Sequence, residues 1–431
     1  MNSPEVYGNS FFRSLRDGTF LLSLAFKNLT RHKRRTVITA SSLAMGLMIY
    51  LLLNSLLTGI EVEGVRNLIW YETGAAQIQN SAYWDDRLFL PMDKDISSPG
   101  EIMNRLELAG FKTAQRTQFG GELIVSKDPY PESGFSRAIF TAVDPTKDAD
   151  VYRIHETLVE GRWLKPGEEG VVLGNAMADQ LGAHIGFPVT IKTRTRDGVW
   201  QTMDFPILGI FRSPNALVNR MHVYLDRSVA DDYLYLGDSA TFISVQRGDW
   251  EDVGSFEKAL QAVIGPGLTV LTWKTLGSDF LGFIQSRSNI TFIILFLVFI
   301  IAAVGVSNTM LLTILERTRE LGMLRAQGMH DKEIFLGLLM EAGAIGFIGG
   351  VTGLVMGSLI NIPLTTTGLD ASGLLTQINA SLPFSGVIRG AWNLKSYFIV
   401  FVAGIVISIL VSIIPIRHAL KQEITEALRH N

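Results

Sequence analysis

The chain has 431 residues, of which 47% are hydrophobic, and its mean hydropathy is +0.26, which is high for a soluble protein. Its net charge of −3 and isoelectric point near 6.2 exclude the global basic field of nucleic-acid-binding proteins, so no nucleic acid is expected as a partner. The absence of cysteine excludes disulfides and thiolate metal sites.

The apolar excess lies in four stretches, and these predict the fold class. They run over residues 36–58, 286–315, 334–361 and 396–416. Each has roughly the 20 apolar residues that a helix needs to cross a hydrocarbon core about 30 Å thick. We therefore expect a helical membrane protein with four transmembrane helices. The polar residues 59–285 form one large α+β extracytoplasmic domain between the first two spans.

The distribution of Lys and Arg predicts the orientation, because short cytoplasmic loops carry an excess of both. Basic residues cluster before the first span, in the 316–333 loop and in the 417–431 tail, whereas the loop 362–395 carries few charges. Both termini and the 316–333 loop are expected in the cytoplasm, and the large domain in the periplasm. The chain is predicted to be a multi-pass protein of the inner membrane. Residues 1–35 mix apolar and basic side chains, which predicts an amphipathic interfacial segment or, alternatively, a soluble helix packed on a neighbour.

Strand and helix patterns alternate within the large domain. Strands are expected at 76–79, 122–125, 138–143, 171–173, 189–192, 241–245 and 268–273, and helices at 99–108, 175–181 and 250–263. Ser97 and Ser98 are candidate caps for the first of these helices. The patterns at the two ends predict a ferredoxin-like unit, and the Gly-rich middle predicts an inserted β-rich lobe.

Three features of the spans call for an explanation. Gly349, Gly353 and Gly357 lie on one helix face, which favours close packing of another helix, within the chain or across a dimer. The alternative is that glycine is simply common in membrane helices. Glu341 is an ionisable group near the start of the third span, which makes it a functional candidate or a partner for boundary cations. The second span exceeds the hydrocarbon thickness, so it tilts or projects as a stalk.

Motifs for catalysis are absent from the sequence. No Gly-Lys dipeptide occurs, so the chain has no phosphate loop for ATP hydrolysis, and we expect no enzyme activity. There is no H-E-x-x-H zinc motif and no G-x-S-x-G nucleophile elbow. We therefore predict no catalytic residue, metal site or cofactor in this chain.

The positive signal is the short loop after the second span. It begins with Glu316, Arg317, Arg319 and Glu320, continues with apolar residues, and contains Gly322 and Gly328. A short amphipathic helix with charges of both signs suits docking on a soluble protein, whereas the plain alternative is a solvated loop.

This loop resembles the E-R-T-R-E-[IL]-G-x-x-[RK]-A-x-G pattern of the ABC transporter permease family that includes MacB, FtsX and the lipoprotein-releasing LolC and LolE subunits. The matching residues are Glu316 to Gly322 without a gap, Arg325, Ala326 and Gly328. Segments 24–29, 161–164, 172–174, 178–186, 415–419 and 426–429 also resemble the family, in the same order along the chain.

The resemblance implies a dimer of two permease chains, identical or paralogous, each docked to a separate ATPase subunit that binds ATP and magnesium. Glu316, Arg317, Arg319 and Glu320 would contact this ATPase, Arg325 would order the coupling helix, and Gly328 would allow the turn into the third span. The family pushes or releases substrates outside the membrane, so membrane lipid and a periplasmic adaptor or lipoprotein carrier are implied partners.

The departures from the family pattern separate three functions. MacB carries its ATPase on the same chain, whereas this sequence has about 35 residues before its first span. FtsX has a much smaller outer domain. The layout therefore favours mechanical release of lipoproteins or other amphiphiles. The alternatives are a MacB-like exporter of peptides, toxins or small molecules with an adaptor, and an FtsX-like scaffold that activates a cell-wall hydrolase.

Overall fold

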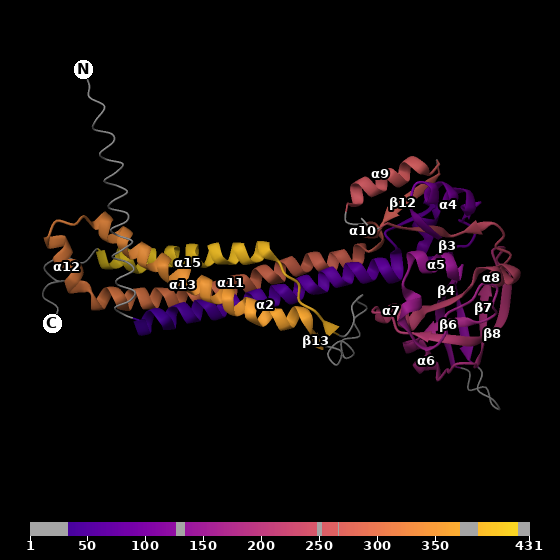
Figure 1. Cartoon of the computed structure of the whole chain (residues 1–431), viewed down its shortest axis with the longest axis horizontal. Helices are drawn as coiled ribbons and strands as arrows, with labels where there is room; N and C mark the ends of the chain where they lie inside the picture. The colour runs from indigo at the N-terminus through magenta and orange to yellow at the C-terminus, as the bar shows by residue number, and fades with distance from the viewer. Residues whose placement is uncertain (1–32, 126–133, 248–251, 266, 371–386, 421–431) are drawn as a thin grey trace, which may run out of the picture. The chain divides into compact units, whose positions relative to one another are not determined.

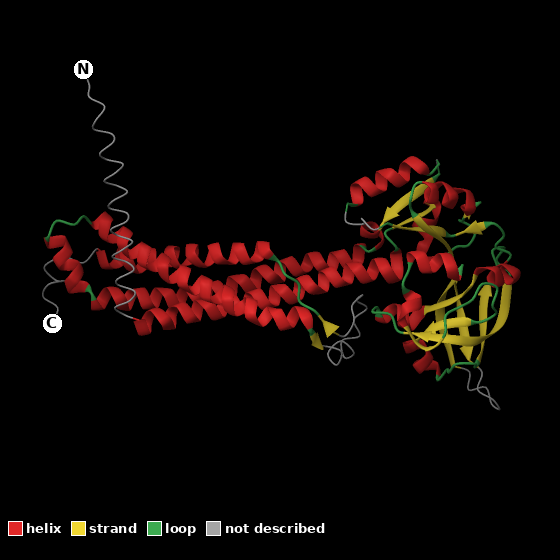
Figure 2. Cartoon of the chain, viewed as in Figure 1, coloured by secondary structure: helices red, strands yellow, loops and turns green. Residues whose placement is uncertain are grey.

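The computed structural model describes residues 33–125, 134–247, 252–265, 267–370 and 387–420. The expected interfacial segment lies outside these ranges except for its last three residues, and the tail lies outside them from residue 421. The chain divides into a helical unit, within 1–60, 285–369 and 389–431, and an α+β unit, within 61–284 and 370–388. Figure 2 displays the helices of the first unit and the mixture of strands and helices in the second.

Four long helices form the helical unit (Figure 1). They are α2 (Lys33–Leu68), α11 (Ser278–Glu316), α13 (Asp331–Thr366) and α15 (Leu394–Leu420), and the short α12 (Thr318–Ala326) joins α11 to α13. Each long helix contains a window that is long and apolar enough to cross a membrane. The first two have 36 and 39 residues, so at 1.5 Å per residue both exceed the hydrocarbon core. The protein is therefore a helical membrane protein with a large additional domain.

Small and branched apolar side chains hold the bundle together. Leu43, Leu47 and Leu51 of α2 form a buried cluster with Ala302 of α11 and Val400 of α15. A helix satisfies its own backbone hydrogen bonds, so segments of this kind can lie in hydrocarbon without unpaired amides. Close packing of side chains then supplies much of the contact between them.

The glycine face of α13 packs against α2 of the same chain. A side-chain carbon added at Gly353 would lie 3.0 Å from the carbonyl oxygen of Ala44 and 3.1 Å from Cβ of Leu47. Gly349 and Gly357 also meet α2 at 3.0 Å or less. The sequence left open whether this face packs within the chain or across a dimer. In the structure it packs within the chain.

We expect Gly353→Ala to destabilise the helical unit by about 1–3 kcal/mol, because the new methyl group meets backbone atoms that cannot rotate away. Gly353→Val should cost more. The control is Gly305→Ala in α11, where the nearest atom is the Ser42 hydroxyl oxygen at 3.7 Å. Thermal unfolding in detergent, followed by gel filtration, measures both. Equal melting temperatures for Gly353→Ala and the parent would contradict the packing argument.

The α+β unit has a strand or helix at each place where the sequence predicts one, and it has others that the sequence does not predict, among them β8, β9, α5 and α8. Its strands are β1 (Ala76–Asn80), β2 (Ile96–Ser97), β3 (Lys112–Val125), β4 (Gly134–Val143), β5 (Leu158–Gly161), β6 (Val171–Gly174), β7 (Pro188–Arg194), β8 (Trp200–Phe211), β9 (His222–Asp226), β10 (Ser239–Ala240), β11 (Phe242–Gln246) and β12 (Leu268–Thr272). Its α-helices are α3 (Ser81–Asp86), α4 (Pro99–Leu108), α5 (Pro145–Val151), α6 (Asn175–Leu181), α7 (Ala216–Met221), α8 (Arg227–Leu234), α9 (Val253–Val263) and α10 (Trp273–Leu276). The shorter turns are η1 (Ile69–Thr73), η2 (Arg87–Phe89) and η3 (Ile154–Thr157), and the two-residue strands β13 (Leu369–Asp370) and β14 (Val387–Ile388) form a separate pair.

Ten strands form one continuous sheet in the order β12-β1-β11-β3-β4-β9-β6-β8-β5, and β7 pairs with both β3 and β8. The two ends have separate hydrophobic cores, one around Phe256 and Leu260 of α9 and one around Phe140 of β4 and Phe205 of β8. The 14-residue strand β3 belongs to both ends. The expected β-rich lobe is thus continuous with the terminal strands, and the ferredoxin-like assignment of those strands stays a prediction.

A buried ion pair ties β3 to α5. The Arg116 guanidinium donates to both carboxylate oxygens of Asp148 at 2.7 and 2.9 Å, and it lies 3.3 Å from the ring centre of Tyr152. Burial alone would lower the pKa of Arg116, but Asp148 raises it above its ordinary value. Each carboxylate oxygen of Asp148 accepts one of these two hydrogen bonds, so both charges are satisfied inside the protein.

Ser98 lies at the expected N-cap position of α4 but makes no side-chain cap. Ser98 precedes α4 with a φ of +54°, and its side chain accepts no capping hydrogen bond. Side chains of Asn80, Asp144, Asn215 and Asp226 cap α3, α5, α7 and α8 instead. These residue types accept hydrogen bonds from the free amides of a first helical turn.

Candidate functional site

The segment between α11 and α13 is a folded helix with defined ends. It follows Arg317 as α12, and Gly328, with a φ of +95°, ends it in a conformation that favours glycine. The next helix begins with a capping box, in which the His330 amide donates to the Glu333 carboxylate at 2.8 Å.

One face of α12 is buried and the other is exposed. Leu321 and Leu324 pack against a buried cluster that contains Ile314, Ile334 and Ile416, so α12 is seated on the ends of three long helices. Arg319, Met323 and Ala326 of α12 are exposed, and 47% of the Met323 surface is accessible. Their spacing of four and three residues places them on one helical face. Glu316, the last residue of α11, and Gln327, which follows α12, are exposed beside this face.

Arg317 anchors α12 to α13. Its Nη1 lies 3.1 Å from Oε2 of Glu341, and its Nε lies 2.9 Å from Oε2 of Glu320. Both Arg317 and Glu341 are buried. The sequence predicted Arg317 as a contact for a docked protein, whereas the structure turns it inward. For Glu341 the sequence left open a functional role or an ion pair with a cation at the membrane boundary. The structure shows the ion pair, with Arg317 as the cation.

Arg325 makes a second anchor. Its Nη2 donates to the backbone oxygen of Leu420 at 2.7 Å, and its Nε lies 2.8 Å from Asp331. These contacts join α12 to the last residue of α15 and the first residue of α13. The arrangement fits the ordering role that the sequence predicts for Arg325.

Met323 is the member of the exposed face that charge patterns do not reveal. An exposed apolar side chain between two charged positions is typical of a docking surface, where a flexible thioether adapts to its partner. Its signal in the sequence is the four-residue spacing from Arg319.

We expect Glu341→Gln to destabilise the helical unit by about 3–5 kcal/mol, because it leaves the Arg317 charge buried without its carboxylate. The double variant Arg317→Met with Glu341→Met should be more stable than either single change, since neither charge then remains. Thermal unfolding in detergent of the parent, Arg317→Met, Glu341→Met and the double variant measures the coupling between the two sites. Additive losses would contradict an interacting pair.

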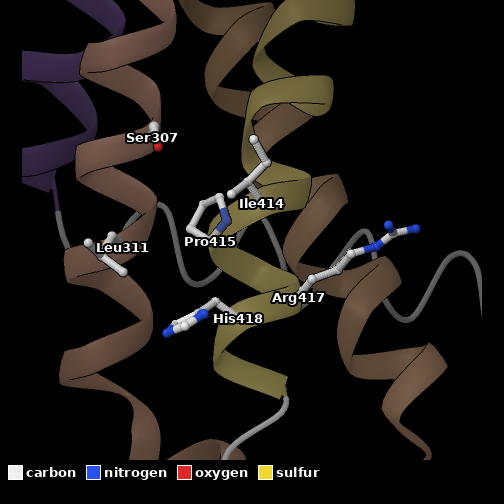
Figure 3. A pocket seen from close by; sticks show the side chains of 6 residues that line it. All are labelled: Ser307, Leu311, Ile414, Pro415, Arg417 and His418. Atoms are coloured by element: carbon white, nitrogen blue, oxygen red, sulfur yellow. The ribbon is translucent and has the colours of Figure 1, made fainter.

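A hollow of about 560 Å³ lies between α11 and α15 in the helical unit. In Figure 3, Ser307 and Leu311 line it from one helix, and Ile414, Pro415, Arg417 and His418 line it from the other. The His418 ring points toward the first helix, whereas the Arg417 side chain points away from it. Ser307 and His418 are the labelled polar side chains that face this hollow. Two polar groups offer few hydrogen bonds for selecting one small molecule.

The α+β unit contains a larger groove of about 750 Å³ beneath the segment that follows α3. Arg137, Lys192, Arg194 and Trp200 are among its lining residues. Among the described residues, no three His, Asp or Glu side chains are grouped as a metal site would require.

Comparisons with known proteins agree with the architecture. Residues 292–424 match the family model "FtsX-like permease C-terminal". An uncharacterized ABC transporter permease of Methanocaldococcus jannaschii is 24% identical over 79% of this chain and 83% of its own length. The macrolide export ATP-binding/permease protein MacB of Pasteurella multocida is 22% identical over 99% of this chain, which spans only 62% of that protein.

The lipoprotein-releasing system transmembrane protein LolC of Neisseria meningitidis is 22% identical over 66% of this chain and 71% of its own length. Among solved structures, the chain matches the periplasmic region of MacB from Actinobacillus actinomycetemcomitans at low similarity. That match has a TM-score of 0.34 and 16% identity, and it covers 48% of this chain and 93% of the other. The chain contains an FtsX-like permease domain, and its relatives are ABC transporter permeases of the MacB, FtsX and LolC family.

Proposed function

We propose that this permease couples ATP hydrolysis by a separate ATPase subunit to the extraction or release of lipoproteins or other amphiphiles from the cytoplasmic membrane. The observation that supports it best is α12, a short helix that is anchored on one side and exposed on the other. ATP and magnesium would be bound by the ATPase, and both chain termini and α12 would lie on its cytoplasmic side.

The anchors make α12 suited to transmit force. Arg317 connects it to Glu341 of α13, and Arg325 connects it to α15, so a partner that pushes on α12 moves the ends of these helices with it. The exposed face offers Arg319 for charge pairing and Met323 for apolar contact. In this reading the α+β unit is periplasmic and carries out the work on the substrate.

A second permease chain would cover α11. Only 11% of its most apolar window is buried, against 39%, 44% and 33% for the windows of α2, α13 and α15. Ile301 and Val304 are 67% and 66% exposed on this helix. A membrane helix that contributes so little to its own bundle is a natural contact surface for another copy or a paralogue.

Export with a periplasmic adaptor is the second candidate. The match to a macrolide export MacB covers nearly the whole chain, more than the match to LolC does. Co-purification with the adjacent ATPase separates the two, because a co-eluting lipoprotein favours release and a co-eluting adaptor favours export.

We expect Arg319→Glu to lower the substrate-stimulated ATPase activity of the complex by about tenfold, because it places a like or unmatched charge in the docking face. Met323→Asp should have a similar effect. The matched control is Lys332→Glu, which reverses an exposed charge in the first turn of α13, outside that face. Membrane insertion and the melting temperature of the permease should not change. Normal coupling in Arg319→Glu would refute the docking assignment.

The dimer makes its own prediction, since the chain has no natural cysteine to interfere. Val304→Cys on α11 should give a crosslinked dimer with a short bifunctional thiol reagent in native membranes. Val355→Cys on α13, which is 53% exposed, is the control and should stay monomeric. Equal crosslinking at both positions would indicate random collision and not an α11 interface.

A further inference from the structure

The groove in the α+β unit has an apolar wall that is costly to keep in water. Leu88 and Phe89 are 85% and 83% exposed, which is extreme for side chains of this size. They belong to η2, and the next residue, Leu90, has a φ of +50°. A side chain in this left-handed region strains the backbone, and folded proteins keep such strain mainly where a function needs it.

The opposite wall is cationic. Strands β4, β3 and β7 lie side by side, and their registers place Glu122 opposite both Arg137 and Lys192. Of the charged residues that line the groove, five are basic and two are acidic. The Glu122 carboxylate lies 3.7 Å from Lys192, which leaves a positive excess on this wall.

Two of these cations have no ion-pair partner among the described residues. Arg137 is exposed on β4, and Arg194 stacks over Trp200 at 4.8 Å from the ring centre. By contrast, Arg196 at the edge of the groove is paired with Asp95 at 2.9 Å. Within the described part of the chain, these two cations and the 57% exposed Trp200 ring line the groove without a carboxylate partner.

The floor of the groove is open because of a glycine. A side-chain carbon at Gly120 would meet only Cδ1 of Leu90, at 3.8 Å. The next glycine differs, since a carbon at Gly121 would lie 2.7 Å from the Lys192 backbone oxygen. Gly121 is thus required by the sheet, whereas Gly120 leaves space between the sheet and the segment that carries Leu88 and Phe89.

We propose that this groove binds a single-chain anionic amphiphile, with its acyl or alkyl chain along Leu88 and Phe89 and its phosphate or carboxylate head at Arg137 and Arg194. The choice of an amphiphile rests on the proposed function, and the charge and apolar walls fix its chemistry. The volume of about 750 Å³ falls within the range of small-molecule pockets.

The sheet geometry disfavours an extended peptide as the occupant. Such a peptide gains most of its affinity by adding a strand to an open sheet edge. At the centre of the groove β3 and β7 each pair with strands on both sides, so no strand can be added there. Single-partner backbone among the described strands that line the groove is limited to 134–138 of β4 and 200–206 of β8. A ligand at the centre binds through its side groups and chain, which an amphiphile does.

The test uses the full chain in nanodiscs of zwitterionic lipid, without nucleotide. The probe is dodecyl phosphate with a diazirine near the end of its alkyl chain, and labelled peptides are identified by mass spectrometry. We expect labels on 87–93 and around Trp200, and about tenfold less labelling there in Arg137→Glu with Arg194→Glu, because two charge-assisted contacts become repulsive. Arg212→Glu, an exposed charge reversal outside the groove, should label normally.

A steric variant separates binding from folding. Gly120→Leu should fill the floor and abolish labelling, whereas Gly100→Leu, on the exposed side of α4 with no atom within 4 Å, should not. The melting temperatures of both variants should match the parent within the error of the measurement.

Three results would overturn the proposal. They are labels confined to the membrane helices, equal labelling by a neutral dodecyl glycerol probe, or protection by inorganic phosphate as strong as that by unlabelled dodecyl phosphate. Labels confined to the membrane helices would instead favour an acidic protein as the partner of this groove. The labelling experiment contains no ATPase, so a negative result says nothing about coupling to the ATPase. The Arg319→Glu variant tests that coupling separately.

Discussion

The salt bridge between Arg317 and Glu341 is the interaction on which the coupling end of the molecule depends. A charge near hydrocarbon is costly alone, so each of these residues requires the other, and Glu320 completes the arrangement from within α12. The pair fixes which face of α12 is turned inward. Everything proposed for Arg319 and Met323 follows from that, because the outward face is what the anchor leaves exposed.

Packing by glycine supplies the stiffness that such an anchor needs. Since α13 lies against the backbone of α2 at Gly349 and Gly353 and against the Leu51 side chain at Gly357, sliding of one helix along the other meets close contacts. Force applied to α12 through Arg317 therefore enters a helix that is already fixed to a neighbour. The helix least fixed within the chain is α11, which is the one proposed to meet a second copy.

Hydropathy alone predicts the four long helices, because the bilayer demands some 20 apolar residues in each. The short helix after the second span is also predictable from its amphipathic pattern. Its orientation is not, because it depends on Glu341 and on the backbone oxygen of Leu420, which lies 95 residues from Arg325 in sequence. The first half of β3 is likewise missed, because its polar residues show no apolar alternation, although it pairs with β11 over five residues. Ser98 is a residue type that often caps helices, but its left-handed backbone leaves its side chain without a capping hydrogen bond.

The groove illustrates the same limit and why it has consequences for function. Its walls come from the segment after α3 and from β3, β4, β7 and β8, and none of these has a recognisable motif. A sequence pattern detects residues at a fixed spacing, but the charges here are brought together only by strand register. Phe89 and Arg194 each look ordinary in sequence. Placed across one opening they form a surface with an apolar side and a cationic side, and an anionic amphiphile satisfies both sides at once, which neither inorganic phosphate nor a neutral lipid does.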